Sequence, residues 1–161
     1  MDEKFVHQFK TADDLRELIK KYQFFARPTR GGSHATLYGR ADVPDGEELI
    51  DGLRPRDWAI SSDKTWVFPS ETRGLSFSSH WQHLKNVYKL KKKHAPNSAV
   101  DVYWVLQTAD IPAGLKFVAD PNDDQHYLLT VTEKMTIWKL IEKLRWLADR
   151  MSVMQDVGRA L

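Results

Sequence analysis

The sequence predicts an α+β domain in which helices at the two ends of the chain flank several short strands. Three observations predict this fold class: an apolar stripe at helical spacing near residues 12–25, a longer one over 133–155, and short strand-like segments between them. The 161 residues suffice for one domain with its own core and are too few for two. We therefore expect a single domain over residues 1–161, with an N-terminal helical segment at 1–34, a strand-rich core at 35–132 and a C-terminal helix at 133–158.

The first helix is predicted over residues 12–25. Thr11 and Asp14 have capping-box spacing, and one apolar stripe follows, formed by Leu15, Leu18, Ile19, Tyr22 and Phe25. The segment 27–32, which contains Pro28 and two glycines, is expected to end this helix. A first strand is predicted at 35–41, with Tyr38 and Arg40 on one side. Residues 42–73 contain three prolines and are predicted to be a long irregular segment with a helical turn near 46–51.

The middle of the chain alternates strand and helix signals. Residues 74–78 alternate small or polar side chains with large apolar ones, as a half-buried strand does. Ser79 and Gln82 form a second capping box, which predicts a helix that ends near His94. Further strands are expected at 100–106, 115–118 and 126–131, with a turn at 120–124.

The last helix, over residues 133–155, has two apolar faces. One face carries Ile137, Leu140, Ile141, Leu144, Leu147, Met151 and Met154 at helical spacing. Met135, Trp138, Trp146 and Val153 cluster on the opposite side. This second face is either covered by the domain itself, which we favour, or docks a partner protein through its tryptophans.

Composition excludes several classes of function. The 24 basic and 22 acidic residues leave a net charge of +2, too weak to argue for bulk binding of nucleic acid or membrane. The absence of cysteine excludes disulfides, thiolate catalysis and Cys-ligated metal centres. No apolar run approaches the roughly 18 residues of a membrane span. The acidic and then polar N-terminus predicts that there is no signal peptide.

Two side-chain clusters have simple structural explanations. His80 and His83 could face one metal ion, with His94 and His126 as further ligands, but capping or packing explains them more simply, so no metal site is predicted. Five lysines between residues 85 and 93 share a predicted helix with Trp81 and Tyr88, a combination suited to single-stranded nucleic acid. Lysines near a helix C-terminus also complement the helix dipole, and we favour that interpretation.

A third pattern is spread along the chain and has a chemical logic. Arg40 lies on an early strand, Ser76 and Ser78 lie on a strand that leads into a helix, and His126 opens a late strand beside Tyr127. An arginine can hold a pyrophosphate through charge-assisted hydrogen bonds, and serines can brace a ribose. A polar group on the third strand can support positive charge that develops on the sugar.

At these residues the chain resembles the ADP-ribosyltransferase superfamily, and within it a family of small toxins secreted by bacterial type VI systems. The resemblance covers roughly residues 35–155. It lies in residues 37–41, in 55–58 and 68–78, and in 109–116 together with His126, Tyr127, Met135 and the final helix. It implies a fold with short central antiparallel strands in a split sheet, flanked by N- and C-terminal helices.

The resemblance also implies an NAD-dependent transferase and roles for particular residues. Arg40 would anchor the pyrophosphate, Ser76 and Ser78 the nicotinamide-side ribose, and His126 a ribose hydroxyl. The nicotinamide would stack on Tyr127, Trp66 or Trp58. Gly39 separates Arg40 from Tyr38, which the family tends to have adjacent to the arginine, so Arg56, Arg73 and His34 are alternative anchors. His126 stands where protein-modifying members commonly carry Glu, and a neutral histidine supplies no carboxylate charge.

A chain of this family would be an antibacterial toxin. It would reside in the cytoplasm of the producing cell, be delivered to the target-cell cytoplasm, and there modify an unknown macromolecular acceptor. A cognate immunity protein would neutralise it at the Met135/Trp138/Trp146 face or at the cleft. Two alternatives remain: a nucleic-acid-binding or RNA-cleaving module that uses Lys85 to Lys93, and a non-catalytic interaction domain of the same fold.

Overall fold

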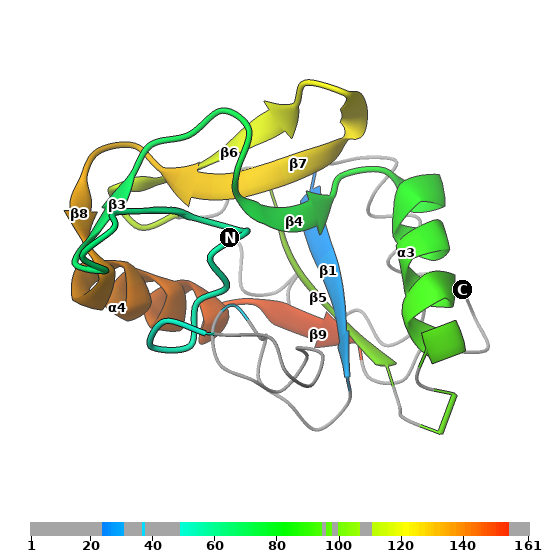
Figure 1. Ribbon diagram of the computed structural model, residues 1–161. Coiled ribbons are helices and arrows are strands. Elements are labelled where there is room, and N and C mark those ends of the chain that lie inside the picture. Colours follow the sequence, from blue (N-terminus) through cyan, green and yellow to red (C-terminus); the bar gives the residue numbers. More distant parts are fainter. Residues whose placement is uncertain are drawn as a thin grey trace. The chain divides into compact units, whose positions relative to one another are not determined.

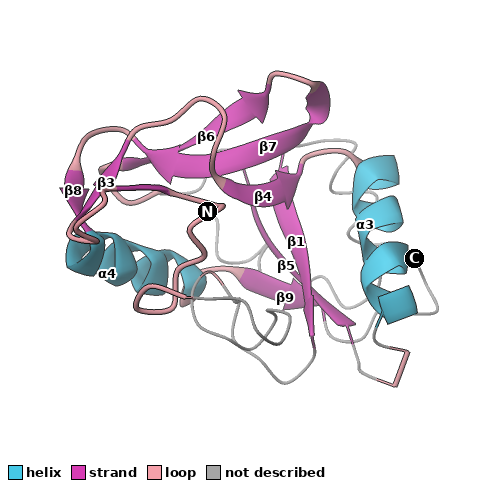
Figure 2. Cartoon of the chain, in the orientation of Figure 1, coloured by secondary structure: helices cyan, strands magenta, loops and turns pink. Residues whose placement is uncertain are grey.

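A computed structural model describes residues 24–30, 37, 49–94, 96–97, 100–106 and 111–154 (Figure 1). The described residues mix helices with antiparallel strands, which confirms the α+β class (Figure 2). They group into two compact units, each drawn from separate stretches of sequence. Unit 1 takes its residues from 1–35, 78–109 and 151–161, and unit 2 takes its residues from 36–77 and 110–150.

Unit 1 is a small antiparallel sheet with one helix. Strand β5 (Val100–Leu106) lies between β1 (Phe24–Arg30) and β9 (Ser152–Met154). β1 pairs with β5 along its whole length, from Phe24 opposite Leu106 to Arg30 opposite Val100. Helix α3 (Trp81–His94) contacts β1 and β5. The core of the unit comprises Phe24, Ala26, Leu84, Val102 and Trp104, all of them buried.

The N-terminal prediction is wrong where the structure describes it. Phe24 and Phe25 belong to strand β1 and not to the end of a helix, and β1 continues through Pro28. Phe24, Phe25 and Ala26 are all buried, so this strand is covered on both faces, and a short buried apolar run fits a strand as well as a helix. Residues 12–23 of the predicted helix lie outside the described residues. Of the predicted strand at 35–41 only Leu37 is described; it is buried in a bend.

Unit 2 holds two groups of strands and one helix. In one group, β7 (Asp123–Val131) lies between β6 (Leu115–Asp120) and β4 (Leu75–Ser78), whose last residue falls in unit 1. In the other, β3 (Trp66–Phe68) lies between β2 (Ala59–Ile60) and β8 (Met135–Thr136). Helix α4 (Ile137–Ala148) contacts β3 and β8. β2 and β3 correct the expectation that residues 42–73 are irregular throughout.

The C-terminal helix is shorter than predicted. α4 ends at Ala148, while Met135 precedes it in β8 and Met154 follows it in β9. The predicted inner face is confirmed for Ile137, Leu140, Ile141, Leu144 and Leu147, all of which are buried. On the predicted second face Trp138 is 67% exposed, whereas Met135 is buried.

The central predictions are largely confirmed. β4, β5, β6 and β7 occupy the predicted strand segments, and β7 begins three residues earlier than expected, at Asp123. α3 ends at His94 as expected but begins at Trp81, and the Nδ1 atom of His80 accepts a hydrogen bond from the backbone N–H of Gln82 at 3.2 Å. In the described part of the chain, no helix is long and apolar enough to cross a membrane.

Candidate functional site

β4 and β7 are neighbours, and they run in opposite directions (Figure 1). Gly74 brings the start of β4 directly against β7, because a Cβ at this position would lie 2.7 Å from Leu128 Cβ and 2.8 Å from the carbonyl oxygen of Leu129. In an antiparallel pair, two residues forward on β4 correspond to two residues back on β7, so we infer that Ser76 lies across from His126. Strand alternation places both on the face of Gly74 and Leu128.

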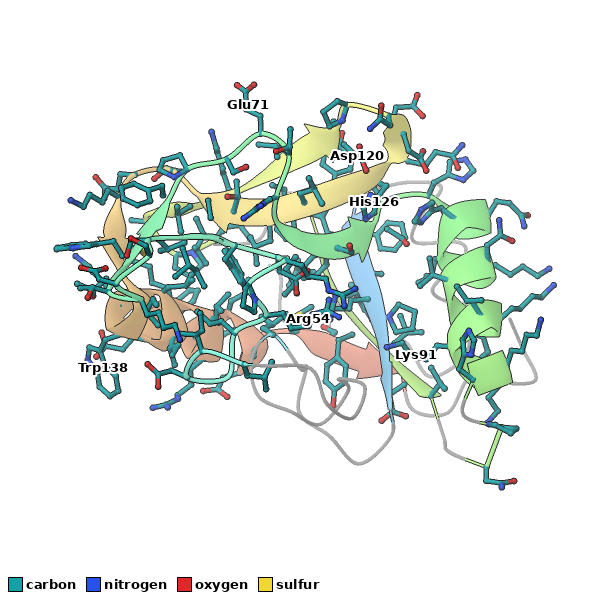
Figure 3. All side chains as sticks on the ribbon, viewed as in Figure 1. Arg54, Glu71, Lys91, Asp120, His126 and Trp138 are labelled. Atoms are coloured by element: carbon teal, nitrogen blue, oxygen red, sulfur yellow. The ribbon has the colours of Figure 1, made fainter. Side chains whose placement is uncertain are left out.

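His126 is held by a carboxylate. Its Nδ1 lies 2.7 Å from Asp120 Oδ2, and the two side chains are only 19% and 22% exposed. Figure 3 shows the pair at the end of the β6–β7 hairpin. An ionised carboxylate only accepts hydrogen bonds, so Nδ1 of His126 is the donor in this pair. The pair therefore brings a negative charge to a strand position where the sequence shows only a histidine.

The geometry of the hairpin creates this pair. The β6–β7 register runs regularly as far as Ala119 opposite Tyr127, and one more regular step would put Asp120 opposite His126. The register shifts at that point, so that the backbone of Asp120 pairs with Asp123 while its side chain still reaches His126. Asp120 Oδ1 accepts a hydrogen bond from the backbone N–H of Asn122 at 2.9 Å, which leaves Oδ2 for His126. Sequence analysis assigned Asp120 only to a polar turn. The available signal was an acidic residue across a tight turn from the candidate histidine.

The two predicted serines have different environments. Ser76 is exposed on β4, as a ligand-contacting hydroxyl must be. Ser78 is 2% exposed, and its Oγ lies 2.6 Å from Nδ1 of His83 on α3. This bond ties the end of β4 to the helix within unit 1. Ser78, predicted to contact a ribose, is thus buried with its hydroxyl in a contact with α3, whereas Ser76 is exposed.

The predicted aromatic contacts do not converge on Ser76 and His126. Tyr127 follows His126 directly, so alternation along β7 places its side chain on the opposite face, with Leu129. Trp66 lies on β3, where Lys134 Nζ stands 4.2 Å from the centre of its ring. Trp58 is 1% exposed and cannot offer a ring to a ligand.

The predicted anchors are placed only in part. Arg40 and His34 lie outside the described residues. Arg56 and Arg73 are both exposed in unit 2. Arg73 directly precedes Gly74 and also lines a pocket of that unit.

The structure gives little support to the histidine cluster as a metal site or to the lysine-rich helix as a nucleic-acid site. Within the described ranges, no three His, Asp or Glu side chains are placed to hold one metal ion. Tyr88 is 3% exposed, so its ring is not available to stack on a base, and the side chain of Trp81 lies outside the described part. What remains on α3 is a run of basic residues in its last turn, formed by Lys91, Lys92, Lys93 and His94.

No family model, curated protein or solved structure gives a match to this chain. The features of this chain that bear on its function are therefore the Ser76/Asp120/His126 geometry and the resemblance in the sequence.

Proposed function

We propose that this chain is a toxin-type ADP-ribosyltransferase that uses NAD, and that Ser76, His126 and Asp120 act on the ribose beside the scissile bond. The observation that supports this proposal is the Asp120–His126 pair on the strand next to β4, on the same face as the exposed Ser76. A hydroxyl, an imidazole acceptor and a carboxylate are suitable partners for ribose hydroxyls.

The reaction requires that the site stabilise the positive charge that develops on the ribose in the transition state. The bond between C1′ of the ribose and the nicotinamide nitrogen breaks, and nicotinamide leaves with the electron pair. A nucleophilic atom of the acceptor bonds to C1′ and loses its proton. In the transition state C1′ carries oxocarbenium character, and a fixed negative group nearby lowers its energy. We assign this role to Asp120 acting through His126, whose Nε2 accepts a hydrogen bond from a ribose hydroxyl.

Ser76 would donate to or accept from the same ribose. The pyrophosphate of NAD remains assigned to Arg40 by the resemblance alone. The acceptor would be a macromolecule of the target-cell cytoplasm. An immunity protein in the producing cell would prevent self-intoxication.

Asp120→Asn gives the sharpest test of this proposal. The amide oxygen can still accept the Asn122 N–H, so the turn is retained, while the negative charge beside His126 is lost. We expect at least a hundredfold slower release of nicotinamide from NAD when the purified variant is incubated with a bacterial extract as acceptor. Ser76→Ala and His126→Ala should also be slower. His94→Ala changes an exposed histidine at the end of α3 and serves as the matched control.

Growth after induction in a bacterial cytoplasm provides the second readout. The wild-type chain and His94→Ala should arrest growth and deplete NAD, whereas folded Asp120→Asn should do neither. Wild-type activity in Asp120→Asn would overturn the assigned mechanism. Growth arrest without loss of NAD would overturn the transferase proposal, and dependence of that arrest on the exposed Lys89 and Lys93 would favour the nucleic-acid alternative.

A further inference from the structure

A pocket of about 280 Å³ lies within unit 2, and Ser76, Asp120 and His126 are not among its lining residues. Ile50, Pro55 and Ile60 form its apolar wall, and Ser62, Lys64 and Arg73 supply polar groups. Pockets for drug-sized ligands typically span about 300–1,000 Å³. This pocket lies just below that range and therefore suits a small ligand.

The charges of the lining are all positive. Lys64 and Arg73 both line the pocket, and none of its lining residues is acidic. Within the described residues no carboxylate lies within ion-pair distance of the Arg73 guanidinium. Guanidinium groups bind phosphate oxygens in a bidentate manner, and an ammonium adds a point charge. The lining is therefore complementary to an anion.

Asp63, the acidic residue that directly precedes Lys64, is hydrogen-bonded within its own turn. Asp63 Oδ1 accepts hydrogen bonds from Ser61 Oγ at 2.5 Å and from the backbone N–H of Thr65 at 3.1 Å. These hydrogen bonds, with that of the Ser61 hydroxyl as the largest cause, lower the pKa of the Asp63 carboxyl below its ordinary value. Asp63 thus shapes the turn and does not line the pocket.

The turn that carries Lys64 has an unfavourable backbone conformation at this residue. Lys64 has φ of 62°, in the left-handed region that L residues rarely occupy. Its N–H donates to the Ser61 carbonyl at 2.9 Å, and Ser61 Oγ accepts from Trp66 N at 3.0 Å. A lysine persists at such a position only when its surroundings enforce it, and strained residues of this kind cluster at ligand sites.

Local hydrogen bonds also fix the segment that supplies Ile50 and Pro55 to the lining. Ile50 and Leu53 exchange two backbone hydrogen bonds of 2.9 Å across a turn in which Asp51 and Gly52 both have positive φ. Arg54 Nε then pairs with Asp57 Oδ2 at 2.6 Å, which fixes the segment that contains Pro55. Both of these lining segments therefore form without a ligand.

We propose that this pocket binds the phosphate group of a small phosphate ester, of the class of nucleoside monophosphates. Arg73 and Lys64 hold the phosphate, the Ser62 hydroxyl donates to one of its oxygens, and the flat part of the ligand lies against Ile50, Pro55 and Ile60. The pocket contains none of Ser76, Asp120 and His126, and the proposal assigns Arg73, an alternative pyrophosphate anchor in the sequence, to this pocket instead.

The test uses the full chain with adenosine monophosphate, adenosine and inorganic phosphate as probes. Titration calorimetry should show binding of the monophosphate and at least tenfold weaker binding of adenosine. Arg73→Gln and Lys64→Asn should each weaken binding of the monophosphate roughly tenfold or more. Asparagine is chosen because it tolerates positive φ. The control Lys139→Gln removes an exposed cation of α4 that does not line the pocket, and it should stay within about twofold of wild type.

The position of the bound ligand is read from backbone amide shifts in NMR spectra. The monophosphate and inorganic phosphate should move the amides of residues 61–64 and 73. Shifts confined to residues around 76 and 126 would overturn the proposal, since they would place the ligand at the transferase site. Wild-type affinity in both pocket variants, an equal loss in Lys139→Gln, or no binding at millimolar concentration would each overturn it as well.

Discussion

At the scale of single residues, Gly74 determines how closely β4 approaches β7. A methyl group there would meet Leu128 Cβ and the backbone oxygen of Leu129 at less than 3.0 Å, and a backbone oxygen in a ladder cannot move aside cheaply. We expect Gly74→Ala to lower the free energy of unfolding by about 1–3 kcal/mol. Urea denaturation measures this change. Thr132→Ala, at an exposed position, should change it by less than about 0.5 kcal/mol. Equal stability of Gly74→Ala and wild type would contradict the close approach.

The raised pKa of the Tyr103 side chain predicts that the free energy of unfolding falls at alkaline pH. Burial, reinforced by the Asp101 carboxylate, raises the pKa of the Tyr103 phenol above its ordinary value. Above pH of about 10 the unfolded chain loses this proton while the folded chain retains it. The unfolded state then binds fewer protons, so stability falls as pH rises toward the raised pKa. Below pH of about 10 this contribution is fully present.

Tyr103→Phe tests this dependence. The variant should show a shallower decline in the free energy of unfolding between about pH 9 and 11 than the wild type does. The remaining decline belongs to other groups and is common to both chains. A decline of the same slope in both would show that Tyr103 has the same pKa in the folded and unfolded states.

The Asp120–His126 pair shows why the candidate site could be predicted only in part. Residue types and their order along the chain indicated Ser76 and His126. The pairing with Asp120 depends on the register of the β6–β7 hairpin, which brings residues 120 and 126 across from each other and which no local propensity encodes. Ser78 was assigned to the site because it alternates with Ser76, yet its hydroxyl is bonded to His83 on a helix that packs in unit 1.

At the scale of elements, the start of α4 depends on one hydroxyl. Thr136 Oγ1 accepts a hydrogen bond from the backbone N–H of Lys139 at 3.1 Å, and Thr136 is extended with ψ of 154°, as an N-cap requires. Thr136→Ala should lower the free energy of unfolding by about 1 kcal/mol because the N–H loses its partner. Thr136→Ser keeps the oxygen and should retain most of the stability. Equal losses in the two variants would show that the methyl group matters and not the cap.

Elements with a single clear hydrophobic periodicity were predicted from the sequence. The short strands β8 and β9, whose residues continue the helical spacing of α4, were not predicted. β5 and β7 combine β-branched and aromatic residues, and α3 has one apolar face, so their type was predictable. Met135, Met151 and Met154 fit the helical spacing of α4, but backbone pairing places Met135 in β8 and Met154 in β9. A 3.6-residue period cannot detect that a strand partner competes for the same residues.

At the scale of the whole molecule, the two units are interleaved along the chain. Unit 1 draws on three stretches and unit 2 on two, so no single continuous piece contains unit 1 alone. The piece 36–150 contains all the stretches of unit 2 but omits β1 and β9, which are the partners of β5 on its two sides. Without them β5 has no backbone partner on either edge.

We therefore expect the piece 36–150 to keep unit 2 and to lose unit 1. Amide hydrogen exchange should show β5 at least a hundredfold less protected than in the full chain, since its ladder bonds are gone. β7 should keep most of its protection, because β6 and β4 both remain on its flanks. Full protection of β5 in the piece would contradict the division into units. Loss of protection in both strands would show instead that unit 2 cannot fold unless unit 1 is complete.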